Sequence, residues 1–314
     1  MDVQHRVLQD ADSHPIGYVK PRADLPDPAA VLPGVAAFDA QTTLLYLSNG
    51  VDRWIPYMPV AGDGPHGQRT IARWVGEDGR TLEMSQLLIT DEGALQRADG
   101  RERGVGAVDL QTSISDQTPI GSGDYSTVSG GKENAAAGES AVIGGGQANK
   151  ANAPYSAILG GQAGCANRYG EQTQAAGCFS LPGDAQTCVL IARGVTTDEN
   201  WTTLALDGQN EPLTIASECA AAFHILLIGR TLTDATEMAR AAFEISGLID
   251  NVAGEIANDY TLHAMAFTHP ALDAGVTSGG GPLLVQVKGL ANTTMRWVAR
   301  ITLVEVSASP IFIC

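Results

Sequence analysis

A degenerate repeat between Tyr125 and Gly177 constrains this chain more than any other feature. The segment reads YSTVSGGKENAAAG, ESAVIGGGQANKANAP, YSAILGGQAGCANR and YGEQTQAAG, and its serines Ser126, Ser140 and Ser156 lie 14 and 16 residues apart. Each of the first three copies joins a short run with branched apolar residues to a glycine pair and then to a polar, alanine-rich segment. A unit this short has few apolar side chains, so it must stack on its neighbours to bury a core.

Glycine pairs supply the expected turns of this repeat. The pairs are Gly130 with Gly131, Gly144 with Gly145, and Gly160 with Gly161. Glycine adopts positive φ without a steric penalty and lets one backbone pass close to another. We therefore expect each copy to form one coil of a β-solenoid. The alternative is a flexible linker rich in Gly, Ser and Ala, but a linker would not keep branched residues in phase.

The pattern SxAxxGGxxNxA in these copies resembles repeats in the fibres of tailed bacteriophages and phage-like particles. It is also similar to the left-handed β-roll in the head of trimeric bacterial adhesins. The segments GDAQTCVLIARGVTT and LLVQVKGLANTTMRWVARITLVEV extend the resemblance to the C-terminal domain of phage fibre proteins. The resemblance implies a homotrimer whose roll is parallel to the three-fold axis, with Val128, Val142 and Ile158 facing inward.

The remaining sequence divides around this repeat, and we expect an all-β fold throughout. Proline-rich residues 1–60 predict a small β module, residues 61–112 a β connector, and residues 113–182 the β-roll stalk. Residues 183–314 hold eight β-favouring runs separated by turn signals, which is typical of an antiparallel β-sandwich or jelly roll. The resemblance implies that the N-terminal module contacts other virion proteins and that the C-terminal domain is the fibre head.

Composition and charge limit the partners. A formal net charge of −16 opposes binding to nucleic acid and to anionic membranes. The N-terminus is polar and no run approaches 18 apolar residues, so we expect synthesis in a host cytoplasm without a signal peptide and no membrane insertion. The resemblance to phage fibres implies a final location in a virion. The five cysteines have no CxxC spacing, which makes free buried thiols the default expectation.

Motifs for catalysis and cofactor binding are missing from the sequence. It contains no GxSxG, HExxH, EF-hand or Walker A pattern, and its six histidines lack metal-ligand spacing. Glycoside hydrolysis needs only two carboxylates, and 35 Asp and Glu residues cannot discriminate. The usual scaffold of cleaving spikes is a much longer β-helix. We therefore expect no enzymatic activity, no cofactor and no metal.

Receptor binding is the favoured function. The candidate receptor contacts lie near turns of the C-terminal domain and are Trp201, Tyr260, His263 and His269. Aromatic rings stack on sugars, and polar side chains pair with hydroxyl groups; Trp201 and Tyr260 are equally compatible with ordinary core or interface positions. We expect a homotrimeric fibre subunit that binds a host-surface polysaccharide or protein. The alternatives are a structural connector or decoration protein and a small glycan-cleaving tailspike.

Overall fold

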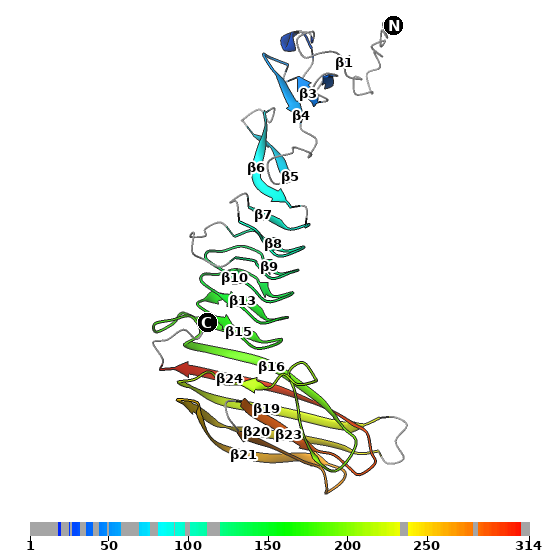
Figure 1. The fold of residues 1–314 in the computed structure, drawn as a ribbon, viewed down its shortest axis with the longest axis vertical. Helices are drawn as coiled ribbons and strands as arrows, with labels where there is room; N and C mark the ends of the chain where they lie inside the picture. The colour runs from blue at the N-terminus through cyan, green and yellow to red at the C-terminus, as the bar shows by residue number, and fades with distance from the viewer. Residues whose placement is uncertain are drawn as a thin grey trace. The chain divides into compact units, whose positions relative to one another are not determined.

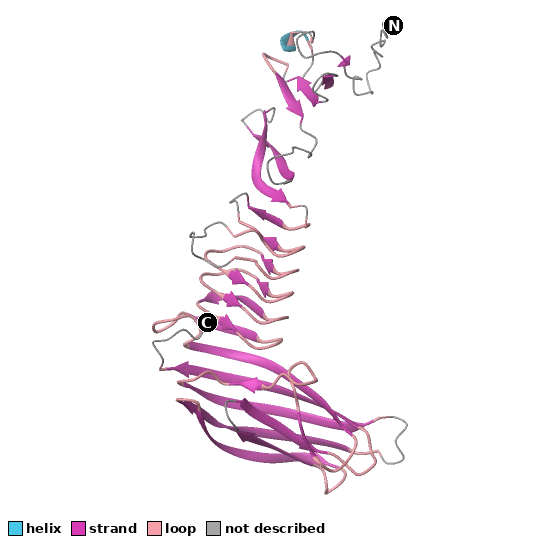
Figure 2. Ribbon diagram, in the orientation of Figure 1, coloured by secondary structure: helices cyan, strands magenta, loops and turns pink. Residues whose placement is uncertain are grey.

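The computed structural model describes residues 18–19, 25, 27–31, 36–39, 44–48, 50–57, 69–75, 81–90, 92–97, 101–111, 120–232, 238–278 and 282–308 (Figure 1). Over these residues the chain is β-structure, and the helical element is a single 3-10 turn, η2, at Pro28–Ala30 (Figure 2). The all-β expectation is confirmed. Across the same ranges, no helix has the length and apolar character needed to cross a membrane. The chain divides into two compact units, Met1–Arg101 and Glu102–Cys314.

The first unit contains short antiparallel sheets. Strands β1 to β4 form one sheet in sequence order, with β1 and β2 parallel, and β5 to β7 form a second set of antiparallel pairs. Their bounds are β1 Tyr18–Val19, β2 Ala36–Asp39, β3 Leu44–Ser48, β4 Trp54–Tyr57, β5 Arg69–Val75, β6 Thr81–Ile89 and β7 Leu95–Arg97. The attachment role of this unit stays a prediction.

The second unit begins with a β-solenoid, the stalk, built from two columns of parallel strands. The first column contains β8 (Val108–Asp109), β9 (Thr127–Val128), β11 (Val142–Ile143), β13 (Ala157–Gln162) and β15 (Gln172–Ala176). The second column contains β10 (Ala135–Ala136), β12 (Lys150–Ala151) and β14 (Cys165–Ala166). Figure 1 shows these strands stacked coil upon coil. The predicted solenoid is therefore present.

The register of the stalk differs from the alignment on serines. Val142 pairs with Thr127 and with Ala157, so the structural repeat is 15 residues, the separation that also links Asn134 and Asn149. Ser140 consequently lies in the turn and not beside Ser126. A shift of one residue moves a strand's side chains to the opposite face.

This shift corrects one of the three predicted core residues. Val128 and Ile158 are fully buried in the stalk core, but Val142 is 40% exposed, and Ile143 takes the inward position instead. The buried cluster comprises Val128, Ala136, Ala141, Ile143, Ala151, Ile158 and Ala166. Small and branched side chains fill the space because the two strand columns lie close together.

The same shift changes the glycine pairs. Gly131, Gly146 and Gly161 occupy equivalent turns with φ of 88°, 84° and 98°. A Cβ on Gly131 would lie 2.2 Å from the Gly146 carbonyl oxygen, so this position requires glycine for both its φ and its close contact. The residues just before these glycines are Gly130, Gly145 and Gly160, and a Cβ at any of them would have no atom within 4 Å. Gly144 is one residue too early to be part of this turn.

Buried amides connect successive coils beside these turns. The backbone N–H of Asn134 donates to Gln111 Oε1 at 2.8 Å, and the backbone N–H of Asn149 donates to Asn134 Oδ1 at 3.1 Å. The Gly164 amide continues the series by donating to Asn149 Oδ1 at 2.9 Å. These side chains are inaccessible to solvent, so each satisfies backbone donors that would otherwise be buried without a partner.

The head of the second unit is an antiparallel sheet of long strands in the order β21-β20-β19-β24-β16 (Figure 1). The bounds are β16 Ala185–Thr196, β19 Cys219–Thr231, β20 Arg240–Val252, β21 Glu255–Phe267 and β24 Met295–Ser307. A smaller sheet is centred on β23 (Pro282–Lys288), which pairs with β17 (Trp201–Thr203), β18 (Leu213–Thr214) and β22 (Asp273–Ser278). The finer assignment to a jelly roll stays a prediction.

The main core lies between these two sheets. Alternate residues of the long strands are buried, as expected for strands with one covered face. Trp297 is 1% exposed, and its indole Nε1–H donates to Thr196 Oγ1 at 3.0 Å. Its ring lies against Gly229, where any Cβ would come within 2.2 Å of it. Trp297 therefore packs β24 against β19 near the start of β24.

The stalk and the head share a strand pair. The last coil ends with β15, and β16 pairs with it antiparallel through Gln172, Thr173 and Gln174. Asp184 holds the preceding turn, since its carboxylate accepts the amides of Phe179, Ser180 and Leu181 at 2.6–2.9 Å. In the structure, the segment 183–186 thus leads from the last coil into β16.

Candidate functional site

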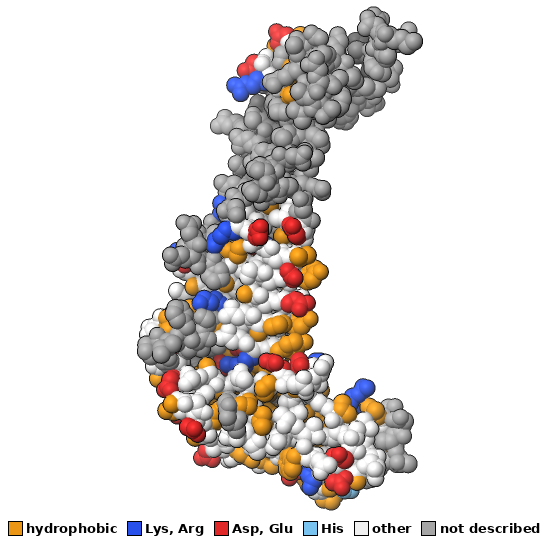
Figure 3. All heavy atoms as spheres, in the orientation of Figure 1, with side chains coloured by type: hydrophobic (Ala, Val, Ile, Leu, Met, Phe, Trp, Pro, Cys, Tyr) orange, Lys and Arg blue, Asp and Glu red, His pale blue; other side chains and the backbone are white. Residues whose placement is uncertain are grey.

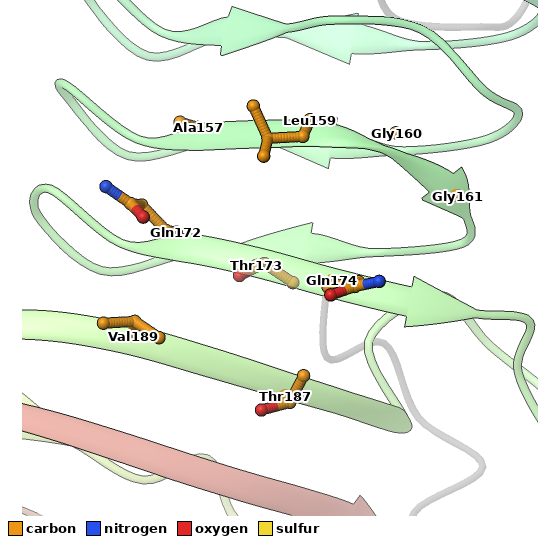
Figure 4. Close-up of a pocket in the computed structure, with 9 residues that line it drawn as sticks. All are labelled: Ala157, Leu159, Gly160, Gly161, Gln172, Thr173, Gln174, Thr187 and Val189. Carbon is orange, nitrogen blue, oxygen red and sulfur yellow. The ribbon is translucent and has the colours of Figure 1, made fainter.

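An open groove crosses the junction of stalk and head. It has a volume of about 560 Å³ and is lined by residues of β13, β15 and β16 (Figure 4). Its residues are Ala157, Leu159, Gly160, Gly161, Gln172, Thr173, Gln174, Thr187 and Val189. Leu159 is 90% exposed and projects from its strand in the close-up. An exposed, mostly apolar hollow of this kind is typical of a surface that binds another molecule.

The groove continues into an uncovered face of the long-stranded sheet. The smaller sheet covers one face of the head, while the opposite face exposes apolar side chains at alternate positions of four strands. These side chains are 43–61% exposed and comprise Ile191, Val195, Leu226, Ile228, Leu248, Val252, Val298, Val304 and Val306. We call this surface the outer face. Its apolar area exceeds the scattered exposure normal for a monomer.

A group of titratable side chains lies on the outer face. His224 Nε2 is 2.8 Å from Glu244 Oε1, and His263 Nδ1 is 3.7 Å from Glu244 Oε2. Glu244 faces His263 across the β20–β21 pair. The hydrogen bond from His224 lowers the pKa of Glu244, so its carboxylate stays ionised in weak acid.

A buried ion-pair network lies behind the groove, where the last coil meets the head. Arg168 bonds through Nη2 to Glu305 Oε1, and its Nε lies 3.9 Å from Glu171 Oε2. Glu305 Oε2 also accepts from Gln186 Nε2 at 3.2 Å and from the Cys188 thiol at 3.1 Å. Residues 137 positions apart therefore meet in a single network.

One positive charge in this network, that of Arg168, faces two carboxylates. Burial opposes the positive charge of Arg168, but Glu171 and Glu305 overcome it and raise the Arg168 pKa. Burial and the same two carboxylates raise the pKa of the Cys188 thiol, which stays protonated and acts as a donor. Ligand-type atoms of Glu171, Cys188 and Glu305 lie within 4.8 Å of one another. Because Arg168 pairs with both carboxylates and Glu305 also accepts from Gln186 and Cys188 of β16, we assign the cluster a structural role in joining stalk and head.

The cysteines differ partly from expectation. Cys178, Cys188 and Cys219 are free thiols, and Cys188 and Cys219 are buried. Cys165 is disulfide-bonded, so the default of a free thiol is wrong for this residue. Cys314 lies outside the described residues, as do the tail residues 310–314.

The four predicted receptor contacts do not form one site. Trp201 lies on β17 of the smaller sheet and is 48% exposed. Tyr260 and His263 are three residues apart on β21, so they point to opposite faces of the strand. His269 follows β21 in a loop, where its Nδ1 accepts the Ala271 amide at 3.2 Å. Trp201, Tyr260 and His263 are exposed and His269 is half-buried, and their role in receptor binding stays a prediction.

Sequence reasoning missed the residues of the outer face. Leu226, Ile228 and Val298 belong to runs that are apolar at almost every position, so alternation does not mark one face as exposed. The missed signal is the regular placement of His224, Arg230, Arg296 and Arg300 among them. Charged residues at every second or fourth position of an apolar strand indicate the side away from the core.

Comparison with known proteins gives structural likeness at low identity. No family model and no curated protein matches the sequence. The tailspike protein of Acinetobacter baumannii phage AM24 is similar at 10% identity with a TM-score of 0.29, covering 64% of this chain and 43% of that one. Tailspike gp49 of A. baumannii bacteriophage Fri1, a capsular polysaccharide depolymerase, is similar at 10% identity and TM-score 0.25, covering 63% and 44%. The tailspike of Acinetobacter phage vB_ApiP_P1 is similar at 10% identity with a TM-score of 0.21, covering 64% of this chain and 47% of that one.

Each of these matches spans less than half of the tailspike concerned. The expectation that this chain is not an enzyme is contradicted, because the Fri1 protein is described as a depolymerase. We withdraw that expectation. With TM-scores below 0.5, we base the function on the residues of this chain alone.

Proposed function

We propose that this chain is a fibre or spike subunit of a phage or phage-like particle and adsorbs that particle to a glycan on the host cell surface. The observation that carries the proposal is the construction of the second unit. A stacked stalk is joined by paired strands and a buried ion network to a head with an uncovered apolar face. Such a unit places an adhesive head at the end of an elongated support.

Further copies of the same chain are the proposed cover of the outer face. Burying apolar side chains stabilises by about 25 cal/mol per Å², and the groove at Leu159 is continuous with this face through β15 and β16. The long edge strand β21 is exposed or half-buried along its length, which is a further template for pairing. The sequence resemblance to trimeric fibres sets the proposed number at three.

Adsorption through several heads is the proposed mechanism. Three heads in one fibre and several fibres on one particle convert weak single contacts into lasting attachment. The first unit is the proposed contact to other virion proteins. A connector that assembles without binding a host is the main alternative, and glycan cleavage is a further activity to test.

Adsorption of the purified full chain to capsulated bacteria and to capsule-free mutants tests this function. Light scattering first establishes how many copies of the purified chain assemble together. We expect a trimer that adsorbs to capsulated cells only, and purified capsular polysaccharide should compete. A trimer that adsorbs to neither cell type would favour the connector. Shortening of the polysaccharide during the assay would show cleavage.

A matched pair of variants tests the outer face. Ile228 lies on β19 in the outer face and is 59% exposed. A charged side chain there should prevent burial against another copy, so Ile228→Glu should prevent assembly while leaving the fold intact. Gln209→Glu adds the same charge in an exposed loop and should assemble normally. An Ile228→Glu protein that remains trimeric would refute the assignment of this face.

A further inference from the structure

One corner of the stalk is formed by the turn that precedes each first-column strand. Backbone amides there bond to carbonyl oxygens of the preceding coil, in the pairs Tyr125 to Val105, Ser140 to Asp124, Tyr155 to Glu139 and Gly170 to Pro154. The donor residue of every pair has a left-handed φ, between 54° and 65°. The corner therefore repeats one strained backbone position in each successive coil.

Two tyrosines occupy this position against its conformational preference. Gly170 is placed there without cost, as is Gly106 in an earlier coil at φ 64°. Tyr125 and Tyr155 both adopt φ 58° at the same place. A left-handed backbone disfavours a residue with a Cβ by roughly 1–2 kcal/mol. Ser140 also occupies this position, with φ 54°, so the corner accepts residues with a Cβ and the side chain it presents can vary.

Neither tyrosine uses the position to bury its ring. Tyr125 is 61% exposed and Tyr155 is 50% exposed. Each ring nevertheless has a support. A Cβ on Gly106 would lie 3.0 Å from Tyr125 Cδ1, so that ring rests over the glycine. Tyr155 packs edge-to-face on Tyr169 at a centroid distance of 5.2 Å. The rings are thus held in place before any ligand arrives, which lowers the entropic cost of binding.

The surroundings of the rings are polar and acidic. Asp124 and Glu139 are exposed in the turns beside Tyr125 and Ser140. On the adjoining side, the Asn152 amide Nδ2 donates to Asn167 Oδ1 at 2.9 Å at the surface. Figure 3 shows hydrophobic and acidic side chains gathered along one edge of the stalk. Carboxylates at this corner disfavour burial against another copy of a chain with net charge −16, and they repel anionic ligands.

We propose that this corner, comprising Asp124, Tyr125, Glu139, Tyr155 and Tyr169, binds successive sugar rings of an extended, uncharged glycan. This assignment rests on the proposed adsorption function and adds a contact on the stalk to those of the heads. Tyr125 and Tyr155 are two coils apart, about 10 Å at the spacing of paired strands. They present aromatic surfaces to sugar rings along one strand of polysaccharide, while the carboxylates and amides accept and donate to hydroxyl groups.

Replacement of the tyrosines by glycine separates binding from folding. Tyr125→Gly and Tyr155→Gly remove the rings but suit the left-handed backbone, so the melting temperature should be unchanged or raised. The affinity of the full chain for neutral capsular polysaccharide should fall by about tenfold for each variant. Ser140→Gly changes the same turn position in the coil between them and should bind as the original chain does.

Two purified capsular polysaccharides, one neutral and one rich in uronic acid, serve as probes for all four proteins. The original chain should bind the neutral polymer and not the acidic one. Binding of the original chain that both tyrosine variants retain would overturn the corner assignment and leave adsorption intact. Preference for the acidic polymer would overturn the uncharged class. Failure of the original chain to bind either polymer or capsulated cells would overturn adsorption itself.

Loss of assembly provides the remaining check. Light scattering should give the same mass for the original chain and for Tyr125→Gly and Tyr155→Gly. A reduced mass would show that the rings contact another copy, and the glycan assignment would be refuted.

Discussion

The stalk and the head of the second unit solve the same problem, burial of a β-sheet face, over different sequence distances. Between residues 123 and 177 of the stalk, the backbone hydrogen bonds between coils join residues about one repeat apart, and the core contains alanine, valine and isoleucine. In the head, strands of 12 or 13 residues pair across the sequence, as Cys219 does with Ser307. Large side chains such as Trp297 and Phe243 fill that core.

The difference teaches how damage should spread in each region. A stalk coil touches only its neighbours, so its stability resembles a sum of nearest-neighbour contributions. The head joins distant segments around one core and should unfold as a unit. Substitutions can break or sharpen this contrast, and the following are ordered by expected size.

Trp297→Ala should have the largest effect. Truncation of a fully buried tryptophan costs about 3–5 kcal/mol and leaves the Thr196 hydroxyl without its donor. Denaturant unfolding should show one transition for the head at much lower midpoint. Trp201→Ala, at a 48% exposed tryptophan, should cost less than about 0.5 kcal/mol. Equal costs for the two would contradict the placement of the core.

Arg168→Met tests the junction, where the two regions depend on each other. Removing one partner of a buried ion pair costs about 3–5 kcal/mol, since Glu171 and Glu305 would remain charged and buried. Hydrogen exchange should increase in β15 and in β16 together. Lys132→Met, which breaks an exposed pair at 3.7 Å, should change stability by less than about 1 kcal/mol. Exchange that increased in only one of the two strands would argue against a shared network.

Ile158→Ala should cost about 2–5 kcal/mol, because the side chain is fully buried between coils. The loss should stay local, with faster hydrogen exchange in β11, β13 and β15 and unchanged protection in β19 and β24. Val142→Ala removes atoms from the opposite, exposed side of the adjoining coil and should be nearly neutral. Loss of protection throughout the head would remove the contrast between regions.

Gly131→Ala should destabilise the stalk by about 1–2 kcal/mol or more, from its positive φ and its contact with Gly146. Gly130→Ala has open space around the new Cβ and should be tolerated. Thermal unfolding of the two variants measures the difference. Equal melting temperatures for the two variants would contradict the conclusion that position 131 requires glycine.

The smallest expected effect is the pH dependence of the Asp184 turn. Burial opposes its ionisation, but amides of Leu181, Ser180 and Phe179 outweigh this and hold the pKa of Asp184 below its ordinary 3.8. The unfolded state therefore takes up a proton first as the pH falls. The carboxylate contributes stability above pH 3.8, and this contribution is lost as the pH falls through the folded pKa.

Melting temperatures of Asp184→Asn and the original chain at pH 2 to 6 measure that contribution. The two proteins should differ most at about pH 5–6 and converge in stronger acid. A constant difference across the range would show that ionisation of Asp184 is not involved.

The solenoid and the β-rich head could be predicted from the sequence because local patterns indicate both. The Gly-Gly turns and branched residues identify the stalk, and alternating apolar runs identify most head strands. It misplaced Val142 because Ser140 was matched with Ser126, although the backbone matches Ser140 with Tyr125. Gly131, Gly146 and Gly161 and the buried Asn134 and Asn149 are better markers, since each set recurs at 15 residues, the spacing of the backbone repeat.

Other features were beyond local pattern. Arg168 and Glu305 meet only after the whole head has folded, so nothing near either residue signals the pair. The corner position is hidden for a different reason. Different coils have tyrosine, serine or glycine at the corner position, because the side chain points outward and packing does not restrict it. Only the shared backbone φ reveals that these residues are equivalent.

The antiparallel pairing of β15 with β16 gives the stalk an adjustable reach. In the described residues, the head bonds to β15 and to the coil just before it, through Ala163 and Cys165, so the earlier coils act as spacers that pair through the same parallel register. Duplicating one 15-residue coil, such as residues 141–155, should carry the head about 4.8 Å farther out without altering either attachment. The number of repeats therefore sets the distance between the first coil and the head.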